Sequence, residues 1–185
     1  WRCQNNKKNF KKNMNYRIIK VLIIFLTLFG IAKNINADEL KRSNAHQFNF
    51  FSGVFDINNE IDINSELFGV QHSNDNLFRD TFLGKLSPIT GFMVTADADT
   101  YFYTGVQAEY KIGKLNLTPS FSPGLYSMGD GKDLGYPLEF KSEVQLSVDF
   151  FGSKLGYSQS HISNGDLGDK NPGADSYMFN FMKSF

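Results

Sequence analysis

The sequence predicts an all-β fold: an eight-stranded antiparallel transmembrane β-barrel preceded by a signal peptide. Three observations predict it. The N-terminal segment is basic with a short apolar core, the rest of the chain alternates apolar and polar residues, and alternating aromatic residues lead to Phe185. Alternation with a period of two is typical of a strand with one apolar and one polar face.

Composition excludes several classes of protein. Hydrophobic residues make up 41% and aromatic residues 15% of the 185 residues, which is unlike a disordered chain. A single cysteine, Cys3, excludes an internal disulfide framework and a cysteine-based metal site. The 19 basic and 19 acidic residues give zero net charge, so the sequence does not predict nucleic acid as a partner.

The charges are unevenly placed along the chain. Residues 1–37 contain eight basic residues and no acidic residue, and they enclose an apolar run at 21–32. That run is too short for a transmembrane helix, which needs about 20 residues, but it suits the core of a secretory signal. A short buried helix is the alternative interpretation.

The N-terminal segment therefore defines two parts of the chain. Met14 is a plausible start, and 35–37 offers a cleavage site. We expect 1–37 to be upstream residues and a signal peptide, and 38–185 to be the barrel. The barrel part has 11 basic and 19 acidic residues, a net charge of −8.

Three segments alternate most clearly. In 136–150 one parity is mostly apolar and the other is polar. Segments 101–110 and 115–125 show the same alternation. Pro119 and Pro123 lie within the last of these segments. Because proline cannot donate to a ladder, they predict bulges or local breaks.

Weaker alternation completes the set of eight strands. These segments are 48–56, 61–70, 88–96, 153–161 and 175–185. The connection 71–87 fits badly, and we expect it to be a long periplasmic link with a short helix through 77–86.

The C-terminal segment predicts which face is outside. Tyr177, Phe179 and Phe181 share one parity with the terminal Phe185, which resembles the C-terminal insertion signal of bacterial outer-membrane barrels. The apolar face is then expected to contact outer-membrane lipid, and the polar face to line the lumen. Phe185 is expected to engage the barrel-assembly machinery. A secreted, lipocalin-like barrel is the alternative.

The topology of such barrels assigns the connections to the two sides of the membrane. Because both termini lie in the periplasm, 127–134 and 164–174 are expected to be external loops, and 111–114 and 151–153 short periplasmic turns.

A base, a hydroxyl group and a carboxylate gather around the last external loop. His161 and Ser163 are two residues apart on an expected strand, so their side chains point to the same side. Asp175 begins the returning strand and can lie across the hairpin from them. A serine becomes a nucleophile when a histidine takes its proton, and the carboxylate orients that histidine.

His161, Ser163 and Asp175 have the parity that is expected to face lipid. Polar groups that face lipid are costly and usually functional. Their position near the external ends of the strands predicts an active site that faces the outer leaflet.

Several segments resemble one known family, the lipid A 3-O-deacylases of the PagL type, also called acyloxyacyl hydrolases. The resemblance covers essentially 38–185. Its motifs are Gly124-Leu125-Tyr126, Leu134-Gly135, Leu138-Glu139-Phe140-Lys141-Ser142, His161-x-Ser163-Asn164 and Asn171-Pro172-Gly173.

The resemblance implies a serine esterase that hydrolyses the 3-O-acyl chain of lipid A, with lipopolysaccharide as substrate and no cofactor or metal. Ser163 matches the nucleophile and His161 the base, while Asp175 stands where the family usually has Glu. Asn164, Asn171 and Gly173 are expected to be oxyanion donors or organisers of the loop. The sequence leaves open whether the protein forms a homodimer.

Other interpretations belong beside this one. The chain could be a noncatalytic small barrel with a structural or adhesive role, or it could transfer an acyl chain. The charged residues on the polar parity, Glu139, Lys141 and Glu143 among them, are expected to form paired charges in the lumen. His46 and His72 are isolated in the sequence and have no ligand-like spacing.

Overall fold

The computed structural model describes residues 46–57, 64–77 and 79–185. The predicted signal peptide lies outside these ranges. Every regular element within them is a β-strand. No helix in the described ranges has the length and apolar character needed to cross a membrane.

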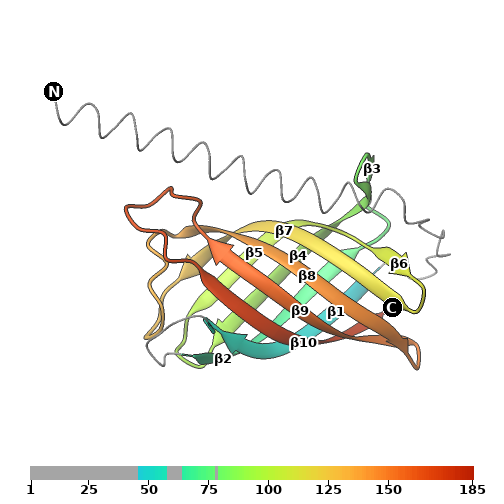
Figure 1. Cartoon of the computed structure of the whole chain (residues 1–185), viewed down its shortest axis with the longest axis horizontal. Helices are drawn as coiled ribbons and strands as arrows, with labels where there is room; N and C mark the ends of the chain where they lie inside the picture. Colours follow the sequence, from blue (N-terminus) through green and yellow to red (C-terminus); the bar gives the residue numbers. More distant parts are fainter. Residues whose placement is uncertain (1–45, 58–63, 78) are drawn as a thin grey trace. The chain divides into compact units, whose positions relative to one another are not determined.

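The strands form one closed antiparallel barrel (Figure 1). Eight strands build the wall in the order β2-β1-β10-β9-β8-β7-β5-β4, and pairing of β2 with β4 closes it. Short strands β3 and β6 extend this wall. The strands are β1 (His46–Phe55), β2 (Ser65–Asn74), β3 (Arg79–Thr81), β4 (Gly84–Thr95), β5 (Thr100–Ala108), β6 (Tyr110–Ile112), β7 (Leu115–Ser127), β8 (Leu138–Phe150), β9 (Ser153–Ser163) and β10 (Ala174–Ser184). The predicted eight-stranded barrel is confirmed.

The two prolines of β7 interrupt the ladder on one side only. The pairs between β7 and β5 or β6 stop opposite Pro123 and again opposite Pro119, and β6 resumes the ladder at Tyr110. Pairing with β8 runs through both prolines without a break. Each proline lacks the backbone N–H that would point to β5 or β6, so a hydrogen bond is lost on that side of β7 only. The predicted local breaks are confirmed.

The expected helix within 77–86 is wrong. Residues 71–74 complete β2, and β3 pairs with β4 as a short hairpin in which Thr81 is opposite Gly84. The Thr81 hydroxyl donates to the Gly84 carbonyl at 2.9 Å. Strand β4 extends beyond the end of β2. Strand β3 provides the hydrogen-bond partners for the backbone groups of β4 in that extension.

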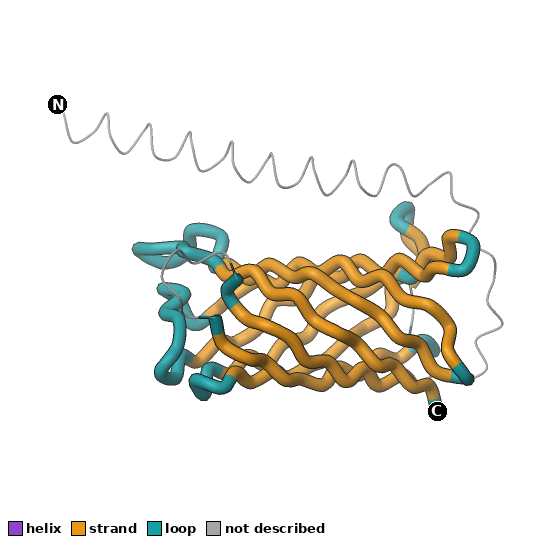
Figure 2. Tube along the Cα trace, turned by 60° about the horizontal axis from the view of Figure 1, so that its bottom comes forward, coloured by secondary structure: helices purple, strands orange, loops and turns teal. Residues whose placement is uncertain are grey.

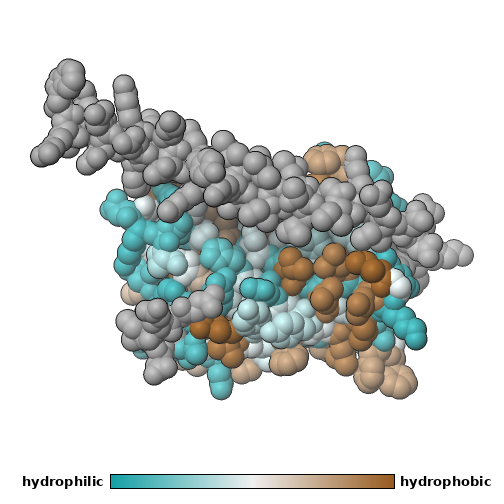
Figure 3. All heavy atoms as spheres, in the orientation of Figure 1, coloured by the Kyte–Doolittle hydropathy of each residue, from teal (hydrophilic) through white to brown (hydrophobic). Residues whose placement is uncertain are grey.

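The barrel has a polar interior and an apolar exterior. Lumen-facing Asn49, Gln145 and Asn180 are buried, whereas the lipid-facing side chains of Phe102 and Phe179 are 54% and 72% exposed. Brown apolar residues gather on the part of the outer surface visible in Figure 3. This is the arrangement of a membrane barrel rather than a soluble one.

Charged and aromatic side chains fill the lumen. Lys141 is 1% exposed, bonds Glu143 at 2.8 Å, and lies 3.9 Å from the centre of the Tyr103 ring. Asn49 donates to both Gln145 and Asn180. The expected ion pairing therefore holds for Lys141 and Glu143. The carboxylate oxygens of Glu139 are buried with no partner within the described residues.

Candidate active site

The candidate site lies at the open end of the hairpin formed by β9 and β10. Strand β9 ends at Ser163, β10 begins at Ala174, and the loop between them lies among the long loops at one end of the barrel (Figure 2). His161 and Asp175 are directly opposite each other in the register. Both project outward, with side chains 53% and 25% exposed.

The cross-strand pair fixes the orientation of the imidazole. His161 Nδ1 lies 2.8 Å from Asp175 Oδ1. Because an ionised carboxylate only accepts hydrogen bonds, this contact places the proton of a neutral imidazole on Nδ1. The lone pair is then on Nε2, the nitrogen that acts as a general base in serine hydrolases.

Ser163 follows on the same face of β9 and is half-buried. No hydrogen bond joins its Oγ to His161 among those of the described residues. Catalytic hydrogen bonds are often long in the free enzyme and tighten when substrate binds. The structure thus joins His161 to Asp175, with Ser163 on the same side of the barrel wall.

Gly173 lies against the His161 ring. A Cβ atom on this glycine would lie 2.9 Å from His161 Cε1 and 3.2 Å from Nε2, and the residue has a φ of +62°. Only glycine combines this backbone conformation with so close an approach to the ring.

Asn164 is buried beneath the loop. Its Nδ2 donates to the carbonyl of Leu134 at 2.9 Å and to that of Lys170 at 2.8 Å, while its Oδ1 accepts from the backbone of Asp166 at 3.0 Å. Both amide hydrogens are therefore used within the protein. Of the two roles expected for Asn164, these bonds favour organising the loop over binding an oxyanion.

Asn171 completes the same network. Its Oδ1 accepts from the backbone N–H of Asn164 at 3.0 Å, and its Nδ2 donates to Asp166 Oδ1, also at 3.0 Å. The side chain is thus engaged at both ends, which again favours loop organisation.

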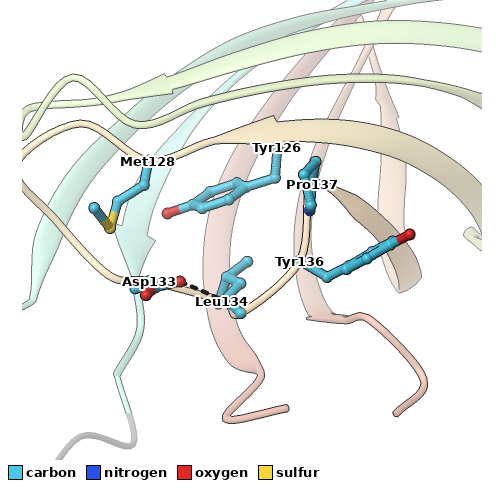
Figure 4. A pocket seen from close by; sticks show the side chains of 7 residues that line it. Tyr126, Met128, Asp133, Leu134, Tyr136 and Pro137 are labelled. Carbon is cyan, nitrogen blue, oxygen red and sulfur yellow. Dashed lines mark hydrogen bonds between the residues drawn. The ribbon is translucent and has the colours of Figure 1, made fainter. Parts of the chain in front are cut away.

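A second long loop, 128–137, lies against the loop between β9 and β10. Lys170 bonds Asp133 at 2.6 Å, and this bond, together with the N–H of Gly135, lowers the pKa of the Asp133 carboxyl. Tyr126, Met128 and Tyr136 contribute to a hollow in this loop region (Figure 4). The contact between Leu134 and Asn164 is not predictable from the sequence, because nothing in either segment marks the other as its neighbour.

Aromatic rings surround the site on the outer wall. Tyr157 stacks on Tyr177 with centroids 5.9 Å apart, and Phe179 packs edge-on against Tyr157. On the other side Phe140, paired with Ser163, stacks on Phe121. A polar trio in an aromatic, lipid-facing wall suits a substrate with a polar head and apolar chains. Within the described ranges no three His, Cys, Asp or Glu side chains form a possible metal site.

The chain matches the model of a known protein family. The family model described as lipid A 3-O-deacylase (PagL) matches residues 64–184, which include every candidate site residue. The chain belongs to the PagL family. Membership and the barrel fold indicate the bacterial outer membrane as its location, and the family description implies a hydrolase.

A solved structure agrees on the fold. The crystal structure of the outer membrane enzyme PagL superposes with a TM-score of 0.58 at 16% identity, covering 75% of this chain and 99% of that chain. Comparison with curated proteins gives no match. The PagL family is thus supported by a sequence model and by a shared barrel fold.

Proposed function

We propose that the protein is a serine esterase that removes the 3-O-acyl chain of lipid A from the outer leaflet. The observation that supports this most is the contact of 2.8 Å between His161 and Asp175 on the lipid-facing wall, on the same face as Ser163. A buried charge pair would serve stability alone, but an exposed imidazole held in one tautomer beside a hydroxyl group suits acyl transfer.

The chemistry follows from the positions of these groups. His161 Nε2 takes the proton of Ser163 Oγ as the oxygen attacks the ester carbonyl, and Asp175 stabilises the imidazolium that forms. The imidazolium then returns its proton to the 3-hydroxyl of the leaving sugar, which leaves an acyl-enzyme. A water molecule, deprotonated by the same imidazole, hydrolyses that ester and restores Ser163.

The depth of the site supports the outer leaflet as its place of action. Asp175 is ten residues from Phe185, or roughly 33 Å of strand and about 25 Å along the membrane normal at a 40° tilt. With the chain ends in the periplasm, as expected for barrels of this class, that distance supports a site at the external interface.

Mass spectrometry of lipid A from cells that produce the protein tests the proposal. We expect the loss of one hydroxyacyl chain, and we expect Ser163→Ala to abolish that loss. Ser160→Ala is the matched control, since Ser160 lies on the same strand but is buried facing the lumen. Unchanged lipid A with a folded barrel would show a noncatalytic protein, and a gain in mass would show acyl transfer instead.

A further inference from the structure

One hydroxyl group interrupts the apolar outer face of β8. Ser142 is the only polar residue on the outward face of this strand, and it is half-buried. The other outward-facing residues of β8 are Leu138, Phe140, Val144, Leu146, Val148 and Phe150. Because a polar group that faces lipid is costly and usually functional, the hydroxyl of Ser142 points to a role on the outer wall.

The register places Ser142 beside the candidate active site. Ser142 is the partner of His161 on β9, and His161 is the partner of Asp175 on β10. The three side chains therefore lie in one row across three neighbouring strands, with the imidazole in the middle. Side chains that are directly opposite each other have Cβ atoms about 4.5–5.5 Å apart, so Ser142 is within reach of the reacting groups.

The hydroxyl of Ser142 is available to a substrate. Among the residues that the structure describes, its Oγ has no hydrogen-bond partner. Phe121 lies opposite Ser142 on β7 and stacks on Phe140, with ring centroids 6.1 Å apart and planes 9° from parallel. These two rings cover the wall beside the hydroxyl. A donor in such an apolar setting stabilises a developing negative charge more than the same donor in water.

Ser142 is also a diagonal neighbour of Ser163. Ser163 is two residues beyond His161 on the same face of β9, and diagonal neighbours of this kind are about 7–8 Å apart, with their Cβ atoms somewhat closer. That separation leaves room for an ester carbon bonded to Ser163 Oγ, with the ester oxygen about 2.7–3.1 Å from the hydroxyl of Ser142. The imidazole is bonded to Asp175 on the other side of β9, so base and donor approach the ester from opposite sides.

We propose that Ser142 is a further catalytic residue, whose hydroxyl donates a hydrogen bond to the ester oxygen as that oxygen becomes negative. The inference rests on the proposed esterase function. As Ser163 Oγ forms its bond to the carbonyl carbon, the electron pair of the carbonyl π bond moves to the oxygen, and the proton of Ser163 passes to His161. Ser142 keeps its own proton throughout. Because the charge develops only during attack, this hydrogen bond stabilises the transition state more than the bound substrate.

Kinetics of two serine variants of β8 test the proposal. Ser142→Ala should lower kcat on lipid A in micelles by about a hundredfold and leave KM nearly unchanged. The pH dependence of kcat should not change, since the base is intact. Ser142→Thr keeps the hydroxyl group and should retain activity. Ser147→Ala is the matched control and should match the parent, because Ser147 faces the lumen from the same strand and is 2% exposed.

Two kinetic results would overturn the role of Ser142 while the esterase function stands. One is a Ser142→Ala chain as active as the parent, in an assay where Ser163→Ala is inactive. The other is equal loss of activity in Ser142→Thr and Ser142→Ala, which would show that the size of the side chain matters and not its hydroxyl.

Labelling with an alkyl fluorophosphonate separates this inference from the proposed function. In the parent, peptide mass spectrometry should find the adduct on Ser163, and Ser142→Ala should form the same adduct more slowly. A folded parent that neither hydrolyses lipid A nor forms the adduct would overturn both the esterase function and the role of Ser142. An adduct on Ser142 would show that Ser142 is the nucleophile, and would overturn its assignment as a donor.

Discussion

The carboxylate of Asp175 determines which nitrogen of His161 is free to act as a base. The family that the sequence resembles usually has Glu at this position, and Asp is one methylene shorter. The 2.8 Å contact shows that the shorter acid reaches the ring, because the two residues are direct partners in the register. The position of the residues on paired strands thus compensates for the shorter side chain.

This contact leads to a prediction for two substitutions at one position. Asp175→Asn should lower kcat by roughly ten-thousandfold, since an amide can hold the wrong tautomer and does not stabilise the imidazolium. Asp175→Glu should retain activity, because it keeps the charge. Both are measured as turnover of lipid A by purified protein in micelles. Equal activity of Asp175→Asn and the parent would exclude Asp175 from the mechanism.

Gly165 and Gly173, both in the loop between β9 and β10, provide a matched pair. Gly173→Ala should displace the His161 ring and reduce turnover, since the added Cβ would lie 2.9 Å from Cε1. Gly165→Ala has the same backbone strain, at a φ of +63°, but its Cβ would meet only the Phe140 ring at 3.7 Å. We expect both variants to lose about 1 kcal/mol of stability and only Gly173→Ala to lose activity. Equal activities would show that Gly173 does not position the base.

At the scale of single residues, the sequence predicts the side of the wall but not the contacts. Parity placed His161 and Asp175 outside because the period of two is a property of every strand. The bonds of Asn164 to Leu134 and Lys170 depend on how two loops fold over each other, and loop conformation has no such period.

Strand β8 contains a buried charge pair that tests the stability of the wall. Lys141→Met leaves Glu143 charged and unpaired in the lumen, which should cost about 3–5 kcal/mol of unfolding free energy. Lys141→Met/Glu143→Leu removes both charges and should recover most of that loss. Urea unfolding in micelles, followed by circular dichroism, measures both. A double variant as unstable as the single one would mean that Lys141 acts through its contact with the Tyr103 ring instead.

At the scale of elements, the long alternating strands were predictable and the interrupted ones were not. Apart from Ser142, the outward face of strand β8 is apolar, so the sequence alone delimits the strand to within two residues. The segment 71–87 combines the end of β2, an insertion, β3 and the start of β4. No single period spans such a segment, and the open edge of β4 that orders β3 is a tertiary feature.

Over the whole molecule, the inside and outside of the barrel should be distinguishable by chemistry. In a Cys3→Ser chain, a fluorophore on Gln159→Cys should be quenched by spin-labelled lipid, since Gln159 is exposed on the outer wall. Its neighbour Ser158→Cys should resist both labelling and quenching, because Ser158 is 1% exposed in the lumen. The reverse result would mean that the apolar face is inside, as in a soluble barrel.

The pairing of the first strand, β1, with the last strand, β10, forms the seam of the barrel. Formation of this seam and formation of the β9–β10 hairpin are two separate steps of folding. Strands β1 and β10 pair directly although Phe48 and its partner Lys183 are 135 positions apart, whereas His161 and Asp175 meet across one short loop. Closing a long loop costs more chain entropy than closing a short one, and pairings distant in sequence slow folding. The β9–β10 hairpin can therefore assemble its histidine and carboxylate early, while the cylinder is still open, and closure of the seam is left as the slow event.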